Sequence, residues 1–207
     1  MTRKSSERIS AEERREQILA AASRVFGERG YYGATTDQIA KAAGISQPYV
    51  VRMFGSKEQL FIEVLGRAIE KLAAALRAVI VDNWDEDNDA ENRAARIGAA
   101  YVDLIKDRGI LLSIMQGFIV GHDPVIGPLA RAGFVSIYRI LRDEAGMGPD
   151  EASDILATGM LFNTLLALRL PDEYEADADV RELIDCTFRS KVDMVLGIVA
   201  KDAADRK

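Results

Sequence analysis

Five side chains that could contact nucleic acid follow a glycine turn within one short segment. They are Ser46, Gln47, Pro48, Tyr49 and Arg52. A glutamine can hydrogen-bond adenine through two atoms, and an arginine can bind guanine or a phosphate. Proline and tyrosine offer apolar contacts to thymine methyl groups. These residue types in this order indicate base reading in the major groove of DNA, if one helix end presents them together.

Local signals around this segment predict two short helices joined by a tight turn. Thr35 starts a capping box, and the helix that it begins ends at Gly44, where Ile45 follows as an apolar anchor. Ser46 can cap the second helix. An amphipathic helix over 11–28 precedes the pair. Together these elements form a helix-turn-helix, whose second helix enters the major groove.

The segment from Gln17 to Phe61 resembles the TetR family of one-component transcriptional repressors. The matching positions are Ala21, Phe26, Gly30-Tyr31, Ala34-Thr35-Thr36, Ile39-Ala40, Ala43-Gly44-Ile45-Ser46, Phe54 and Ser56-Lys57-Glu58-Gln59-Leu60. The resemblance implies an all-α fold of about nine helices. It also implies a three-helix DNA-binding domain over 1–55 and an effector-binding, dimerising domain over 56–207.

The resemblance further implies which residues touch DNA. Thr35, Thr36 and Lys57 would hold phosphates at helix N-termini, and Ser46, Gln47, Pro48, Tyr49 and Arg52 would lie at the base edges. Simpler roles are open for several of them: Thr35 as a helix cap, Lys57 as a solvated lysine and Tyr49 as a packing residue. The family often has aromatic residues where this chain has Val51 and Met53. We therefore expect Tyr49 to make the aromatic phosphate contact.

The rest of the chain also reads as helical, with segments expected over 90–107, 109–120, 124–145, 150–169 and 180–200. An apolar stripe in the last of these is formed by Ile184, Phe188, Val192, Val195 and Val199. Apolar helices need a second surface to cover them. We expect a homodimer through residues 150–200, as the resemblance implies; the alternative is that the stripe belongs to the core of one monomer.

A small-molecule effector is expected among the middle helices, again by resemblance. The expected ligand-binding residues are Tyr101, Met115, Phe118, Phe134, Tyr138, Phe162 and Asn163. A mostly apolar cavity with few polar groups would suit a hydrophobic ligand. The alternative is that these side chains are ordinary core, and that the Asn163 amide only bonds a neighbouring helix.

Composition and charge exclude several other classes of protein. The chain has 207 residues, 48% of them hydrophobic, with one cysteine and one histidine. Cys186 and His122 cannot form a disulfide or a clustered transition-metal site, so neither a metal nor a cofactor is expected. No apolar run reaches the roughly 18–20 residues that span a bilayer, and no secretory signal is visible. No Ser or Cys nucleophile with a positioned base is visible either, so we expect a cytoplasmic protein that is not an enzyme and does not bind membranes.

The distribution of charge agrees with a DNA-binding N-terminal segment. The net charge is −6, yet residues 1–60 carry 10 Lys and Arg against 7 Asp and Glu. Arg3, Lys4 and Arg8 could form an arm near the minor groove, or simply a soluble tail. An electropositive segment on an acidic body suggests two functions in one chain.

These observations predict a dimeric DNA-binding transcriptional regulator. Most simply, it is a repressor that a small hydrophobic effector releases from a palindromic operator on double-stranded DNA. Two alternatives are open: a helical ligand-binding protein or enzyme whose N-terminal domain is only structural, and an effector-independent regulator or activator.

Overall fold

A computed structural model describes residues 10–81, 90–105 and 108–204. Within these residues the chain is helical and contains no strand, which confirms the all-α prediction. The expected N-terminal arm and the acidic residues 84–89 lie outside the described residues. No described helix is both long enough and apolar enough to cross a membrane.

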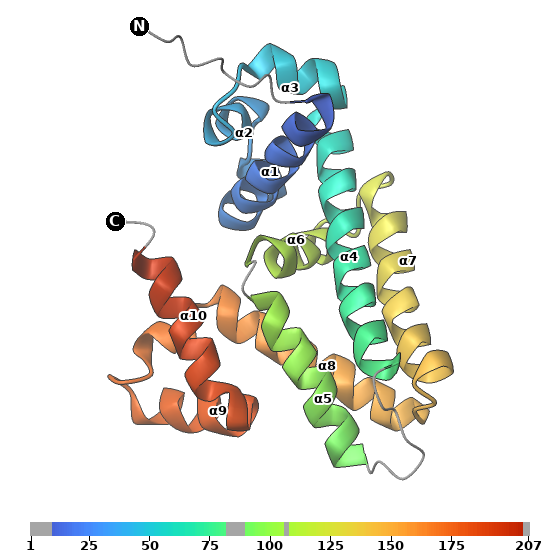
Figure 1. Ribbon diagram of the computed structural model, residues 1–207, viewed down its shortest axis with the longest axis vertical. Helices are drawn as coiled ribbons and strands as arrows, with labels where there is room; N and C mark the ends of the chain where they lie inside the picture. The colour runs from blue at the N-terminus through green and yellow to red at the C-terminus, as the bar shows by residue number, and fades with distance from the viewer. Residues whose placement is uncertain (1–9, 82–89, 106–107, 205–207) are drawn as a thin grey trace, which may run out of the picture.

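Three helices form the N-terminal part of the molecule, at the top of Figure 1: α1 (Ala11–Gly33), α2 (Thr36–Ala42) and α3 (Gln47–Phe54). The long helix α4 (Lys57–Val81) leaves this part and runs down beside α7. The remaining helices are α5 (Ala90–Ile105), α6 (Arg108–Ile119), α7 (Ile126–Arg139), α8 (Pro149–Ala167), α9 (Ala178–Phe188) and α10 (Val192–Ala204). Short turns of other helix types lie at Ile140–Glu144, Leu170–Glu173 and Arg189–Lys191.

Two helix boundaries differ from the sequence-based expectation. The first helix is assigned as far as Gly33, but Gly30 has a non-helical φ of 70°, which glycine adopts readily, and it separates a short final piece from the helix expected over 11–28. The single helix expected over 180–200 is two helices, since Arg189 has a φ of 47° and breaks the helix. No glycine or proline marks that break, so the sequence carried no signal for it.

Three apolar clusters hold the helices together. The first joins α1, α2, α3 and the start of α4; its centre is an edge-to-face contact between the rings of Phe26 and Phe61, with centroids 4.9 Å apart. The same cluster includes Val120, which directly follows α6, and Ile126 and Ala130 of α7. The core of the N-terminal part therefore extends beyond the boundary expected at residue 55, into the helices of the body.

The second and third clusters form the body. The second packs α4, α5, α6, α7 and α8 around residues such as Leu72, Ile137 and Leu141. The third packs α8 against α9 and α10. Close approach of α4 to its neighbours depends on glycines: a Cβ on Gly117 would lie 2.7 Å from Leu65, and one on Gly133 would lie 2.3 Å from Ile69.

Candidate functional site

The connection between α2 and α3 is a tight helix-turn-helix. Thr35 accepts a hydrogen bond from the backbone N–H of Gln38, whose side chain bonds back to the Thr35 N–H, so the predicted capping box is formed. Gly44 reverses the chain with a φ of 64°. The Gln17 side chain on α1 donates to the carbonyl of Ala43 at 2.7 Å. The turn is therefore fixed both locally and from the preceding helix.

One face of α3 is buried, and the opposite face is open. Val50 and Phe54 pack into the first cluster, whereas Pro48, Val51 and Arg52 are exposed. Ser46 occupies the position before the helix, but its side chain makes no capping hydrogen bond. This differs from the expectation that Ser46 caps α3, and it leaves the hydroxyl free of that role.

Two contacts hold the candidate base-reading side chains in place. Gln47 donates from Nε2 to the Thr36 hydroxyl oxygen at 3.2 Å, which joins α3 to α2. The guanidinium carbon of Arg52 lies 4.7 Å from the centre of the Tyr49 ring. Tyr49 is half-buried against the first cluster, so it both packs and faces outwards. Ordering these groups in advance lowers the entropy lost on binding a partner.

The structure gives Lys57 an internal role that the sequence did not suggest. Its ammonium group donates to the carbonyl oxygens of Tyr31, at 2.9 Å, and of Ala34, at 3.1 Å. It also lies 4.6 Å from the centre of the Tyr31 ring. Lys57 thus caps the C-terminal end of α1, where a cation is favourable, although it stands at the start of α4. One ammonium N–H is left for another acceptor.

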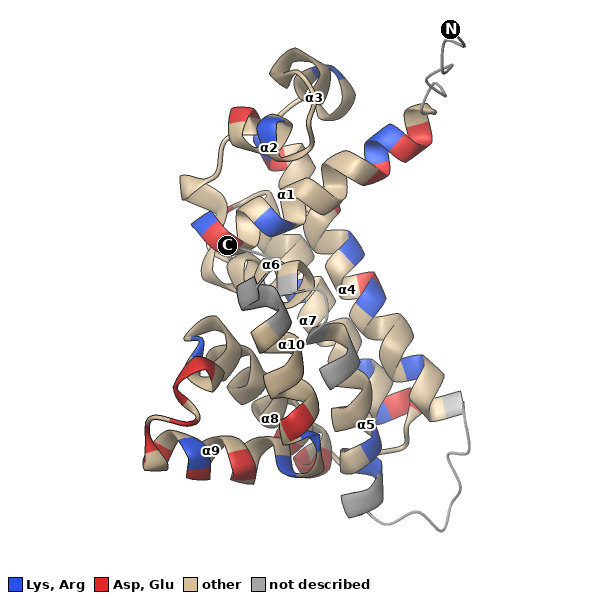
Figure 2. Ribbon diagram, turned by 60° about the vertical axis from the view of Figure 1, so that its left-hand side comes forward, with Lys and Arg blue, Asp and Glu red and all other residues tan. Residues whose placement is uncertain are grey.

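The charge around α3 suits an anionic partner. Helix α3 carries no acidic residue, and Figure 2 shows it as an uncharged ribbon apart from the blue of Arg52. Acidic residues are instead frequent in and before α9, in red in the same view. Negative charge is therefore concentrated away from the helix that would approach DNA.

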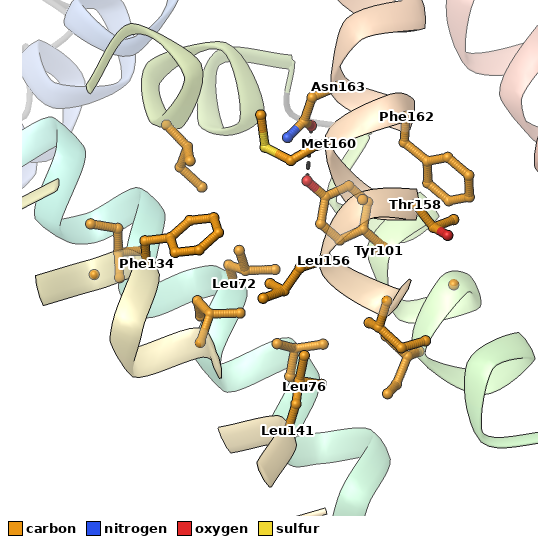
Figure 3. Close-up of a pocket in the computed structure, with 18 of the residues that line it drawn as sticks. Leu72, Leu76, Tyr101, Phe134, Leu141, Leu156, Thr158, Met160, Phe162 and Asn163 are labelled. Carbon is orange, nitrogen blue, oxygen red and sulfur yellow. Dashed lines mark hydrogen bonds between the residues drawn. The ribbon is translucent and has the colours of Figure 1, made fainter. Parts of the chain in front are cut away.

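A second candidate site is a cavity of about 90 Å³ inside the body. Helices α4, α5, α6, α7 and α8 all contribute to its wall (Figure 3). Five residues predicted from the sequence line it: Tyr101, Phe118, Phe134, Phe162 and Asn163.

Met115 and Tyr138, the other two predicted residues, are not among the lining residues. Their neighbours Ile114 and Ile137 hold the cavity-facing positions instead. Adjacent residues on an α-helix point about 100° apart, so a prediction wrong by one position misses the cavity. Sequence reasoning also missed the wall that α4 contributes through Ile69, Leu72 and Leu76, because a helix face that lines a cavity has the same apolar periodicity as one packed in a core.

A hydrogen bond joins the two most polar lining residues. The Tyr101 hydroxyl donates to Oδ1 of Asn163 at 2.8 Å, shown as the dashed line in Figure 3. Burial raises the pKa of Tyr101 to about 12, because the charged phenolate would lose its hydration. Tyr101 is therefore a neutral donor at physiological pH.

The apolar stripe near the C-terminus belongs to the core of one monomer. Ile184, Phe188, Val195 and Val199 are buried in the third cluster with Phe162 of α8. The stripe is therefore explained by the core of one monomer, which was the alternative to a dimer contact, and it is not evidence for a dimer. Its periodicity could not reveal which surface covers it, since a neighbouring helix and a second subunit leave the same pattern.

The remaining candidates form no chemical site. His122 is exposed, and its Nε2 lies 3.4 Å from the Tyr32 hydroxyl. Cys186 is exposed on α9. No group of three or more His, Cys, Asp or Glu side chains in the described part of the chain is arranged to hold a metal ion.

Comparisons with known proteins agree with the geometry. Residues 18–64 match the family described as "Bacterial regulatory proteins, tetR family". The HTH-type transcriptional activator FasR of Mycolicibacterium smegmatis is 41% identical over 88 residues, 42% of this chain and 39% of FasR. RutR of Escherichia coli, an HTH-type transcriptional regulator, is 38% identical over 77 residues, 37% of this chain and 35% of RutR. The chain thus matches about two fifths of the length of these relatives.

The fold is similar over nearly the whole chain to solved structures. A TetR-like transcriptional regulator from Rhodococcus sp. RHA1 superposes with a TM-score of 0.61 at 18% identity. The superposition covers 95% of this chain and 99% of that one. Residues 18–64 therefore match the TetR family of bacterial regulatory proteins in sequence, and the described chain has the fold of a TetR-like regulator.

Proposed function

We propose that this chain is a dimeric DNA-binding transcriptional repressor that leaves its operator when a small apolar effector enters the cavity. The observation that carries the proposal is the open face of α3. It presents side chains suited to DNA on a helix-turn-helix whose residues match the TetR family. The acidic charge of the chain lies mainly elsewhere, which favours approach by this face.

The proposed DNA contacts divide into two kinds. Gln47, Pro48 and Arg52 would read base edges, and Ser46 would stand beside them at the start of α3. Tyr49 would support Arg52 and contact the backbone. Thr35, Thr36 and the remaining N–H of Lys57 would hold phosphates. The Thr36 oxygen already accepts from Gln47, so its hydroxyl proton is available for a phosphate oxygen.

Two copies of the chain are needed for specific binding, because one helix reads only a few base pairs. We place the dimer contact within residues 150–200, now on the outer face of α8. Leu161 on α8 is 40% exposed and Leu168, directly after α8, is 67% exposed, while Leu183 on α9 is 40% exposed. Two recognition helices related by a twofold axis would then reach half-sites about 34–36 Å apart.

Helix α4 would connect the cavity with the DNA-binding helices. Ile69 and Leu72 line the cavity, while the first turns of α4 pack in the first cluster. An ion pair joins Arg67 of α4 to Glu16 of α1, with a distance of 2.7 Å from Nη1 to Oε1. A tilt of α4 would therefore carry α1 with it. Release requires that the effector bind the tilted shape more tightly than the DNA-bound shape.

Oligonucleotide selection followed by equilibrium binding tests the DNA-reading role. Gln47→Ala should lower affinity for the selected palindrome by about 1–3 kcal/mol, mostly through one base step, and leave random DNA unchanged. Ser153→Ala, exposed on α8, is the control. Absence of any preferred palindrome, or equal losses on specific and random DNA for Gln47→Ala, would contradict the proposal.

A second candidate function is activation of transcription, which the name of the relative FasR favours. The two functions use the same DNA contacts and differ in the effect on the promoter. A reporter gene downstream of the selected operator distinguishes them. Repression predicts more reporter signal when the gene for this chain is deleted, and activation predicts less.

A further inference from the structure

The wall of the cavity carries no charge in the described part of the chain. Aliphatic, aromatic and glycine residues make up nearly all of it, and its polar side chains are Tyr101, Thr158 and Asn163. An ionised ligand in such a site would lose its hydration without gaining a countercharge, which is far more costly than burying a neutral group. The wall therefore selects against carboxylates and ammonium ions.

Asn163 supplies a hydrogen-bond donor on the wall. Its side chain is 3% exposed, and its Oδ1 is occupied by the Tyr101 hydroxyl at 2.8 Å. The amide nitrogen bonds to none of the described residues, and among these residues no unpaired side-chain nitrogen or oxygen is fully buried. The nitrogen must therefore reach the cavity, and Figure 3 shows it on the side away from the Tyr101 ring.

The Tyr101 hydroxyl fixes which end of the Asn163 amide faces the cavity. Since Tyr101 stays protonated and donates to Oδ1, the opposite end of the amide, a pure donor, is left for a ligand. A buried donor without an acceptor is costly, so a purely hydrocarbon ligand would not satisfy the site. Tyr101 is thus a positioning residue for Asn163.

We propose that the cavity binds a small, uncharged molecule with an apolar body and a hydrogen-bond acceptor that takes the Asn163 amide N–H. The inference rests on the proposed function in treating the cavity as the effector site. The volume of about 90 Å³ is below the roughly 300–1,000 Å³ of pockets for drug-sized ligands, which favours a single ring or a short branched chain. A cyclic ketone has this chemistry.

Four six-membered-ring probes test the ligand class on the full chain. Cyclohexanone carries an acceptor, methylenecyclohexane has the same shape without one, cyclohexanecarboxylate is an anion and cyclohexylammonium is a cation. Calorimetric titration should give cyclohexanone an affinity at least about 100-fold above either charged probe. An equal or tighter affinity for a charged probe, or no binding of any probe, would overturn the proposal.

Variants test the role of Asn163 through the ratio of two affinities, that of cyclohexanone to that of methylenecyclohexane. A general loss of binding changes both affinities and leaves this ratio unchanged. In Asn163→Leu, the affinity of cyclohexanone relative to methylenecyclohexane should fall about tenfold. In Tyr101→Phe it should fall by less, because the amide remains but can rotate. Val135→Ala, at an exposed position of the cavity-lining helix α7, should leave the ratio unchanged. An unchanged ratio in Asn163→Leu would overturn the proposal.

Operator binding, measured on the same samples, separates this inference from the proposed function. Cyclohexanone binding without release of DNA would support the ligand class and count against the effector role of the cavity. Release of DNA by a charged probe that binds in the cavity would support the effector role and overturn the ligand class.

Discussion

Replacement of Lys57 by methionine tests both roles assigned to this residue. Methionine keeps an apolar chain of similar length and removes the ammonium group. Two charge-assisted hydrogen bonds to the carbonyls of Tyr31 and Ala34 are lost. Each such bond contributes about 1.5–3 kcal/mol to the free energy of unfolding. At this half-buried site water can bond to the freed carbonyls in the variant, which reduces the net loss. The cation–π contact with Tyr31 adds about 0.5–1 kcal/mol.

Removing a cation from the start of α4 should raise the free energy of unfolding by about 0.3–1 kcal/mol, because the helix dipole disfavours positive charge at a helix N-terminus. The net expectation is a loss of about 2 kcal/mol in the free energy of unfolding. For a chain of this size that is about 4–8 °C in the unfolding midpoint. Lys41→Met, whose 76% exposed side chain forms a surface pair with Asp37, should cost at most about 0.5 kcal/mol.

Urea unfolding at a fixed protein concentration measures the stability loss, and titration with random DNA at several salt concentrations measures the phosphate contact. Loss of one phosphate contact should reduce the slope of log affinity against log salt by about 0.9 per Lys57 side chain. Equal stability of Lys57→Met and Lys41→Met would refute the capping argument. An unchanged salt slope would refute the phosphate contact.

Three further outcomes follow from the structure. Leu161→Glu should shift the sedimentation of the protein from dimer to monomer while helicity is kept; a persisting dimer would place the interface elsewhere. Gly127→Ala should lower the unfolding midpoint, because its Cβ would lie 2.2 Å from the Gly121 carbonyl oxygen. Gly66→Ala, whose Cβ would meet nothing within 4 Å apart from the backbone of its own helix, should instead stabilise the chain by up to about 1 kcal/mol. Equal effects of the two substitutions would contradict this packing. The raised pKa of Tyr101, about 12, means that its contribution to stability is complete below pH 10 and is lost as pH rises towards 12. Tyr101→Phe should therefore show a shallower loss of stability across that range, and an unchanged pH profile would contradict the burial of this phenol.

The helix-turn-helix could be predicted from the sequence because its determinants are local. Thr35 finds its capping partner three residues along the chain, and Gly44 supplies the required left-handed turn without help from distant segments. Lys57 could not be assigned its internal role in this way. Its acceptors on α1 lie more than 20 residues earlier, and only the packing of α4 brings them together.

The cavity was only partly predictable for a similar reason. Aromatic residues such as Tyr101 and Phe162 suggested an apolar interior, but the exact face of each helix depends on rotation about its axis. The pairing of Tyr101 with Asn163, 62 residues apart, is a tertiary contact that no local pattern encodes. The C-terminal stripe could not be assigned from the sequence to a dimer contact or to the monomer core for a different reason. Periodicity shows that a helix face is covered, but it does not show which surface covers it.

The first apolar cluster determines where helices α1, α2 and α3 could be joined to the C-terminal domain of another protein. A chimaera joined at residue 55 would leave behind Leu60, Phe61 and Val64, together with the contribution of Val120 and Ile126. The transferred piece would then expose the surface that Phe61 covers on Phe26. A join inside α4, beyond Leu65, keeps Phe61 with its partner and requires the recipient to supply surfaces equivalent to α6 and α7, including the contacts of Val120, Ile126 and Ala130.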